Sequence, residues 1–224
     1  MTEEMVEIIV GDDVTVQSKS IHAHKALLTA KSSWFKCALK LRFKEGIQKK
    51  VYLKNHHPDT FQIFIQWLYS GDFAMSPGSS KHSSPFHGYI LGDFLQATDF
   101  TGYCMDRLFT TFALGSKACP IDLSTIDFVY KSTTNGSVLR KFVALTVATH
   151  LRTQRSAALY GKKLGWGVEL ETAPEFLVDL VLAFKLSLIP ASRQYMDWGD
   201  LRKLKETTEN DVPETGDDTV EFEG

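Results

Sequence analysis

The chain has 224 residues, 43% hydrophobic and 23% charged, which is typical of a globular protein with one domain and an appended part, or two small domains. No apolar run approaches the ~20 residues needed to span a bilayer, and the acidic N-terminus does not resemble a secretory signal, so we expect an intracellular protein of the nucleus or cytoplasm with no membrane partner. The segment Glu206–Gly224 holds eight acidic residues and no Lys or Arg, which leaves the rest of the chain at +6, without the cluster of basic and aromatic residues that would indicate direct nucleic-acid binding.

The N-terminal region has the alternation of a β-hairpin. Val6, Ile8 and Val10 share one face of a predicted strand, and Gly11–Asp13 supplies turn residues before a second strand at Val14–Gln17. Ser18–Ser20 is interpreted as another turn, after which Ile21–Ala23 resumes strand pairing.

Two short helices follow this hairpin. The first is predicted over His24–Ala30 and the second over Ser33–Leu41, with a side-chain oxygen of Ser32 or Ser33 as its N-terminal cap. The charged stretch Arg42–Lys50 contains a glycine and lacks an apolar period, so it is predicted to be a loop.

The middle of the chain predicts one strand and one strongly apolar helix. The strand is Val51–Leu53. The helix begins at His57–Thr60, with proline in its first turn, and repeats apolar residues at i, i+3, i+4 and i+7 from Phe61 to Leu68. Gly71 is placed to end it in the left-handed conformation.

A loop rich in Ser, Gly and Pro is predicted over Met75–Gly88. Its Ser76-Pro77 and Ser84-Pro85 pairs are interpreted as turn residues, with proline-directed phosphorylation sites as the alternative. Helical spacing returns over Ile90–Phe100, and a further helix is predicted over Tyr103–Leu114.

The C-terminal half is predicted to be helical. Ser137 can cap a helix that runs to about Leu151, and Thr153–Glu171 is glycine-rich and predicted to be a loop. Thr172–Glu175 has the form of a capping box before a helix over Phe176–Leu188. The acidic segment beyond is predicted to be disordered, because its few apolar residues cannot offset the entropy of ordering it.

Five motifs follow one another along the chain in the order in which they occur in one protein family. They are Ile21–Leu28 (IHAHKALL), Ser32–Phe35, Val51–Leu53, Pro58–Phe61 and Trp67–Asp72 (WLYSGD). The chain therefore resembles a BTB/POZ protein over about half of its length. The segment Phe128–Lys141 is similar to one found in fungal BTB-domain proteins.

The resemblance implies an α+β fold in which a short three-stranded sheet is packed with a cluster of helices. We expect the BTB/POZ domain to occupy residues 1–114, an all-helical extension residues 115–204, and a disordered acidic tail residues 205–224.

A BTB/POZ domain also implies a non-catalytic interaction module or scaffold, commonly a homodimer. Its usual dimer surface lies on the first two helices, where Lys25 matches the basic member of the family's charged pocket and Met5 stands where an Asp is usual. The surface expected from the resemblance comprises His24, Lys25, Leu28, Thr29, Ser33 and Trp34.

The alternative functions are a substrate adaptor of a cullin-type ubiquitin ligase and a BTB-type transcriptional regulator. Cullin recruitment in the family often uses a hydrophobic residue followed two positions later by an acid, whereas here Met75 follows Phe73. The partner surface expected from the resemblance comprises Asp72, Phe73, Met75 and Tyr103.

No motif indicates an enzyme, a cofactor or a metal site. His22 and His24 lack converging further ligands, His82 and His87 are expected to be solvated in their loop, and three cysteines without C-x-x-C spacing do not predict a zinc finger. The glycine-rich Gly161–Gly167 lacks the spacing of a phosphate-binding loop. The tail is interpreted either as solubilising or as an interaction peptide at Val220, Glu221, Phe222 and Glu223.

Overall fold

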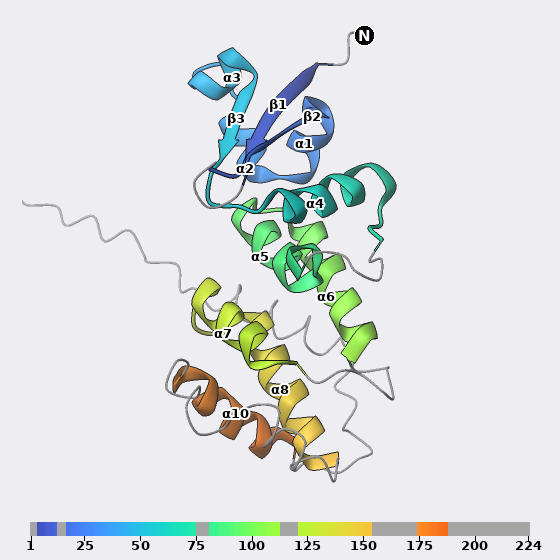
Figure 1. Cartoon of the computed structure of the whole chain (residues 1–224), viewed down its shortest axis with the longest axis vertical. Helices are drawn as coiled ribbons and strands as arrows, with labels where there is room; N and C mark the ends of the chain where they lie inside the picture. Colours follow the sequence, from blue (N-terminus) through green and yellow to red (C-terminus); the bar gives the residue numbers. More distant parts are fainter. Residues whose placement is uncertain (1–3, 13–16, 75–80, 113–120, 154–173, 188–224) are drawn as a thin grey trace, which may run out of the picture.

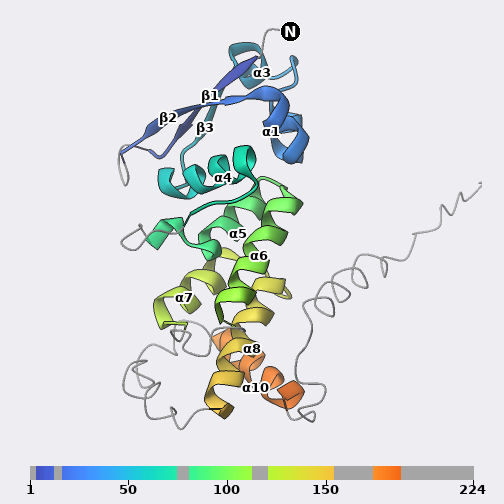
Figure 2. The same ribbon diagram turned by 90° about the vertical axis from the view of Figure 1, so that its right-hand side faces the viewer.

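The computed structural model describes residues 4–12, 17–74, 81–112, 121–153 and 174–187, with the sheet at one end of a long axis and α10 at the other (Figures 1 and 2). None of the described helices is long and apolar enough to cross a bilayer. The elements are β1 (Met5–Val10), β2 (Lys19–His24), α1 (Lys25–Lys31), α2 (Ser33–Ala38), α3 (Lys44–Gln48), β3 (Lys50–Leu53), α4 (Pro58–Ser70), η1 (Lys81–Ser83), α5 (Pro85–Phe94), α6 (Thr98–Phe112), α7 (Leu123–Ser132), α8 (Val138–Thr153) and α10 (Pro174–Ser187).

The sheet has the expected three strands, with β1 between antiparallel β2 and parallel β3. Val6, Ile8 and Val10 are all fully buried on one face, as their alternation predicts.

The predicted turn at Ser18–Ser20 is wrong in part, because Lys19 and Ser20 belong to β2. On this edge strand Ser20 is exposed and its hydroxyl donates a hydrogen bond to Glu7 Oε1 at 2.9 Å, so a residue typical of turns is accommodated in the sheet. The predicted strand Val14–Gln17 lies mostly outside the described residues, and Gln17 is not in a strand.

The start of α2 is fixed by the turn between α5 and α6. The Ser32 hydroxyl accepts a hydrogen bond from the Phe35 N–H at 3.1 Å, which confirms the predicted cap, and donates one to the Leu95 carbonyl at 2.6 Å. Trp34 N–H donates to the same carbonyl at 3.3 Å. The orientation of α2 is therefore set by a segment more than sixty residues away.

The predicted loop Arg42–Lys50 is wrong in its middle, where α3 forms a short helix. Gly46 packs so closely on the preceding chain that a Cβ there would lie 2.2 Å from the Lys40 carbonyl oxygen. The helix ends at Lys49 in the left-handed conformation, with φ 53°. Four of its five residues are not buried, so no apolar period in the sequence marks it.

The helix α4 follows its prediction at both ends. Pro58 opens the helix after His57, whose Nδ1 accepts a hydrogen bond from Asp59 N–H at 3.1 Å, and Gly71 closes it with φ 77°. Its apolar stripe packs beneath the sheet (Figure 2). The stripe comprises Phe61, Ile63, Phe64, Ile65 and Trp67.

Helices α5 and α6 form a tightly packed pair. A Cβ on Gly88 would lie 2.8 Å from Cys104 Sγ, and one on Gly92 would lie 2.8 Å from Thr101 Cγ2.

Two predictions for this part of the chain are wrong. Residues 85–88 belong to α5 and not to a loop, and the stretch 90–100 is not one helix, because Gln96 adopts φ 50° and the chain turns into α6.

The C-terminal helices share a second core with α5 and α6. Phe86, Met105 and Leu108 from that pair pack with apolar side chains of α7, α8 and α10. The helix α7 has no counterpart among the predicted helices. The helix α8 begins as predicted, with the Ser137 hydroxyl accepting a hydrogen bond from Leu139 N–H at 3.3 Å.

A buried arginine joins these three helices. Arg140 of α8 donates hydrogen bonds to the Tyr130 carbonyl at 2.6 Å and to the Thr133 hydroxyl at 3.0 Å, and it also bonds the Thr133 carbonyl. Its guanidinium pairs with Glu175 at the start of α10. Tyr130 adds a hydrogen bond of 2.8 Å to Asp179. Glu175 therefore contacts α8, and the predicted capping partner Thr172 lies outside the described residues.

Candidate functional site

A cluster of three charged residues lies at the edge of the predicted dimer surface. Lys25 Nζ lies 3.2 Å from Glu4 Oε2, and Lys49 Nζ lies 3.2 Å from Glu4 Oε1. Hydrogen bonds from Lys49 and Lys25 lower the pKa of the Glu4 carboxyl. Glu4, the residue directly before Met5, is therefore an acid paired with Lys25 at the start of β1.

His24 lies at the junction of β2 and α1 and contacts α4. Its backbone N–H donates to the Tyr69 hydroxyl at 3.0 Å, and its Nδ1 lies 2.5 Å from the same oxygen. The two rings also meet edge to face, with centroids 5.6 Å apart. These contacts give His24 a structural position between elements.

The remaining residues of the predicted dimer surface differ in their exposure. Ser33 is exposed, and Thr29 and Trp34 are half-buried. The Trp34 ring packs against Phe94 at 5.5 Å, so it is supported from below. Leu28 is fully buried in the core and does not reach the surface.

The predicted partner surface forms a compact group at the end of α4. Tyr103 of α6 donates a hydrogen bond to Asp72 Oδ1, and Phe73 N–H donates to the same oxygen at 2.6 Å. The Phe73 ring packs edge to face on Tyr103 at 5.4 Å and is only 2% exposed. Phe73 is therefore a core residue in this structure, and Met75 lies outside the described residues.

The ionisation of this group follows from its hydrogen bonds. The Tyr103 hydrogen bond, assisted by the Phe73 N–H, lowers the pKa of Asp72. Burial, and then the hydrogen bond to Asp72, raise the pKa of Tyr103. The carboxylate is thus held ionised beside a neutral phenol, which fixes the loop after α4 on α6.

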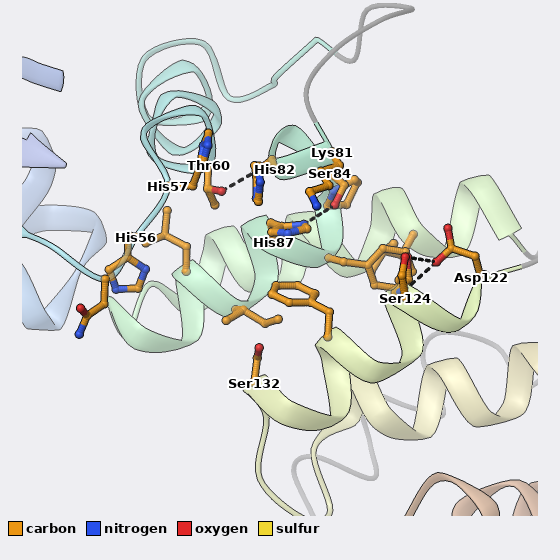
Figure 3. Close-up of a pocket in the computed structure, with 18 of the residues that line it drawn as sticks. His56, His57, Thr60, Lys81, His82, Ser84, His87, Asp122, Ser124 and Ser132 are labelled. Atoms are coloured by element: carbon orange, nitrogen blue, oxygen red, sulfur yellow. Dashed lines mark hydrogen bonds between the residues drawn. The ribbon is translucent and has the colours of Figure 1, made fainter. Parts of the chain in front are cut away.

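A cavity of about 990 Å³ lies between α4, η1 and α5 on one side and α7 on the other. Figure 3 shows His57, His82 and His87 side by side at its centre. The rings of His57 and His82 stack at 3.9 Å, and His87 stacks on Phe128 of α7 at 4.0 Å. The expectation that His82 and His87 are solvated is wrong, because both rings pack between elements.

Burial affects the titration of two of these histidines. Burial, and then the neighbouring His57 and Lys81, lower the pKa of His82, and burial, and then the neighbouring His82, His57 and Lys81, lower the pKa of His87 to about 4. The Ser84 hydroxyl lies 2.8 Å from His87 Nδ1. Within the described ranges, no three His, Cys, Asp or Glu side chains are grouped so that they could hold a metal ion. The contacts of this cluster connect α4, α5 and α7.

Two sets of predicted site residues are not brought together in the structure. The predicted dimer surface lies on the end of β2, α1 and α2, whereas the Asp72 group lies after α4 and on α6. The tail residues Val220, Glu221, Phe222 and Glu223 lie outside the described residues. Glu4 was not among the predicted site residues, although it pairs with Lys25. The acidic residues directly before Met5 are the feature of the sequence that could have indicated it.

Comparisons with known proteins find a family match for the N-terminal part of the chain. Residues 8–108 match the family model of the BTB/POZ domain. A solved structure that is similar to this chain is the BTB domain of zebrafish PATZ1, with 18% identity, a TM-score of 0.33, and coverage of 46% of this chain and 75% of that one. No curated protein sequence matches the chain significantly. The assignment therefore rests on the family match of residues 8–108.

Proposed function

Because residues 8–108 of the chain match the family model of the BTB/POZ domain, we propose that the protein is a non-catalytic interaction scaffold that forms a homodimer through α1 and α2. BTB/POZ domains are protein-interaction modules, and this family match is the observation that carries the proposal. The ion pairs of Glu4 with Lys25 and Lys49 support the proposed dimer, because an acid paired with a base beside these helices is what the family's charged pocket would require.

The α1–α2 surface is also prepared for binding. Ser32 and Trp34 form hydrogen bonds with the turn after α5, and the Trp34 ring packs edge to face on Phe35 and at a tilt on Phe94. A surface that is already ordered loses little conformational entropy when a partner binds. This order favours association through α2 over a role as a solvated helix.

A scaffold needs a second surface, and α10 supplies a candidate. Four large apolar side chains of this helix are exposed on one side although the opposite side packs on α8. Contiguous apolar surface of this kind often marks an interaction site. The residues are Leu177, Val178, Val181 and Leu182.

The proposed dimer is tested by light scattering on the full chain and on two glutamate variants. Ser33→Glu adds a charge in the exposed first turn of α2, where the helix dipole tolerates an acid. Gln62→Glu adds the same charge on the exposed side of α4. We expect a dimeric parent, a monomeric Ser33→Glu variant and a dimeric Gln62→Glu variant. A chain that stays monomeric at every concentration contradicts the proposal.

The ligase-adaptor alternative has less support than the scaffold. Its hydrophobic determinant, Phe73, is 2% exposed, and the adjoining Asp72 is occupied by Tyr103. Co-purification with a cullin from cells distinguishes the adaptor from the scaffold. Capture of a transcriptional corepressor in the same experiment identifies the regulator instead.

A further inference from the structure

A basic and apolar surface, here called the α2–α3 patch, lies at the sheet end of the molecule (Figure 1). It is formed by α2, α3 and the segment between them. Every member is exposed to solvent. The members are Lys36, Lys40, Leu41, Arg42, Phe43, Lys44 and Ile47.

The positive charges of the α2–α3 patch are not neutralised by neighbouring acids. Among the described residues, Lys40, Arg42 and Lys44 form no ion pair. The two lysines that follow α3 behave differently, since Lys49 pairs with Glu4 and Lys50 with Glu7. An excess of unpaired positive charge within one short segment attracts an anionic partner.

Apolar side chains alternate with these charges. Leu41 is 73% exposed, Ile47 is 66% exposed and Phe43 is 37% exposed. The Arg42 guanidinium lies 4.8 Å from the centre of the Phe43 ring, which leaves the ring beside a cation. The partner that fits such a surface carries acids and large apolar residues in alternation.

The chain itself contains a segment with this chemistry. From Glu214 onward it carries five acidic residues and no basic residue, and the apolar residues Val220 and Phe222 stand on either side of Glu221. We propose that this acidic segment, residues 214–224, docks on the α2–α3 patch of its own chain. Its acids would face Lys40, Arg42 and Lys44, and Val220 and Phe222 would cover the exposed apolar side chains.

A long segment joins α10 to the acidic segment. The last described helix ends at Ser187, and α10 lies at the opposite end of the molecule from α3 (Figures 1 and 2). Residues 188–213 can span up to about 85 Å when extended, at about 3.3 Å per residue. A return of the acidic segment to the sheet end would draw on this length. The inference does not rest on the proposed dimer, because the patch and the segment belong to one chain.

Zero-length crosslinking of carboxylates to lysines in the full chain tests the docking. We expect crosslinks from Glu221 or Glu223 to Lys36, Lys40 or Lys44, with a yield that falls severalfold when salt is raised to about 0.5 M and exposed charges are screened. The triple variant K40Q/R42Q/K44Q removes the charges, and the yield of crosslinks to Lys36 should fall to background. The control K54Q/K131Q/K141Q lowers the net charge equally at exposed positions elsewhere, and it should retain the crosslinks.

A second pair of variants tests the apolar half of the contact. Phe222→Ser should reduce the yield without changing the charge, and Leu41→Ser should do the same from the other side. Crosslinks that persist in both variants and in K40Q/R42Q/K44Q overturn the proposal. A mixture of isotope-labelled and unlabelled chains distinguishes docking within one chain from docking between two copies. Crosslinks found mainly between differently labelled chains would show that a second copy occupies the patch, and they would overturn docking within one chain.

Discussion

Glu4 and Lys25 form an ion pair of 3.2 Å that joins the start of β1 to the start of α1. The backbone follows the same path, since Lys25 N–H donates to the Glu4 carbonyl at 2.8 Å. The other oxygen of the Glu4 carboxyl contacts Lys49 after α3. One carboxylate therefore holds together three elements at the edge of the proposed dimer surface.

The first prediction concerns the acid titration of Glu4. Because Lys49 and Lys25 lower its pKa in the folded chain, its charge stabilises the fold above the ordinary glutamate pKa of 4.5, and this contribution is lost as the pH falls through the lower folded value. NMR titration of the side-chain carboxyl should give a midpoint below 4.5. In K25M/K49M the midpoint should rise. A midpoint at or above 4.5 in the parent chain contradicts the pairing.

The second prediction concerns the close packing of α5 on α6. Gly92→Ala places a methyl group 2.8 Å from Thr101 Cγ2 and 3.0 Å from the Phe100 ring, and we expect a loss of about 1–3 kcal/mol of unfolding free energy from overpacking. Gly102→Ala is the matched control, because nothing lies within 4 Å of its Cβ. The control should be neutral or more stable by up to about 1 kcal/mol, since alanine favours a helix. Urea unfolding measures both changes, and equal stability of the two variants would contradict the close approach.

The third prediction concerns Arg140. Replacing it by Met keeps the volume but leaves the Tyr130 and Thr133 carbonyls without their donor, so we expect a loss of about 2 kcal/mol or more. Hydrogen exchange should accelerate in α7, α8 and α10 and remain slow in the sheet. Lys131→Met removes an exposed pair with Asp127 and should change stability by less than about 0.5 kcal/mol. A tolerated Arg140→Met would show that the arginine network contributes little.

The fourth prediction concerns His87, whose folded pKa is lowered to about 4 from 6.5. Below pH 6.5 the unfolded chain takes up a proton that the folded chain does not, so the stabilising contribution present above pH 6.5 is lost between pH 6.5 and about 4. His87→Phe can keep the stacking on Phe128 without titrating, and its urea midpoint should fall less steeply with acid. An NMR inflection of the His87 ring near pH 6.5 would contradict this prediction.

Local signals in the sequence were sufficient for much of the fold. The Ser32 cap, the alternation in β1 and the Gly71 terminus are each set by a few neighbouring residues, and all three were predicted correctly. The helix α3 was missed because it is short and largely exposed, so that it has no apolar period. The start of α5 at Pro85 was missed because the Ser-Pro composition before it also fits a loop.

The candidate sites were harder to predict than the elements, because they depend on contacts between distant residues. His82 and His87 look like solvated loop residues in sequence, and only the approach of α4 and α7 stacks them against other rings. The contact of Glu4 with Lys25 depends on how the start of β1 lies beside α1. A shift of one residue in an alignment is enough to put Met5 opposite the family's acid in place of Glu4. Phe73 follows an exposed aspartate, yet it is turned into the core by α6.

The core beneath the sheet and the core of the C-terminal helices both include side chains of α5 and α6. A fragment that ends at residue 114 would keep Phe86, Met105 and Leu108 but lose the side chains that cover them. Such a fragment should bind hydrophobic dyes and aggregate more readily than the full chain, because its newly exposed surface is apolar. The C-terminal helices thus cover an apolar surface of α5 and α6, and the N-terminal module without these helices would be prone to aggregation.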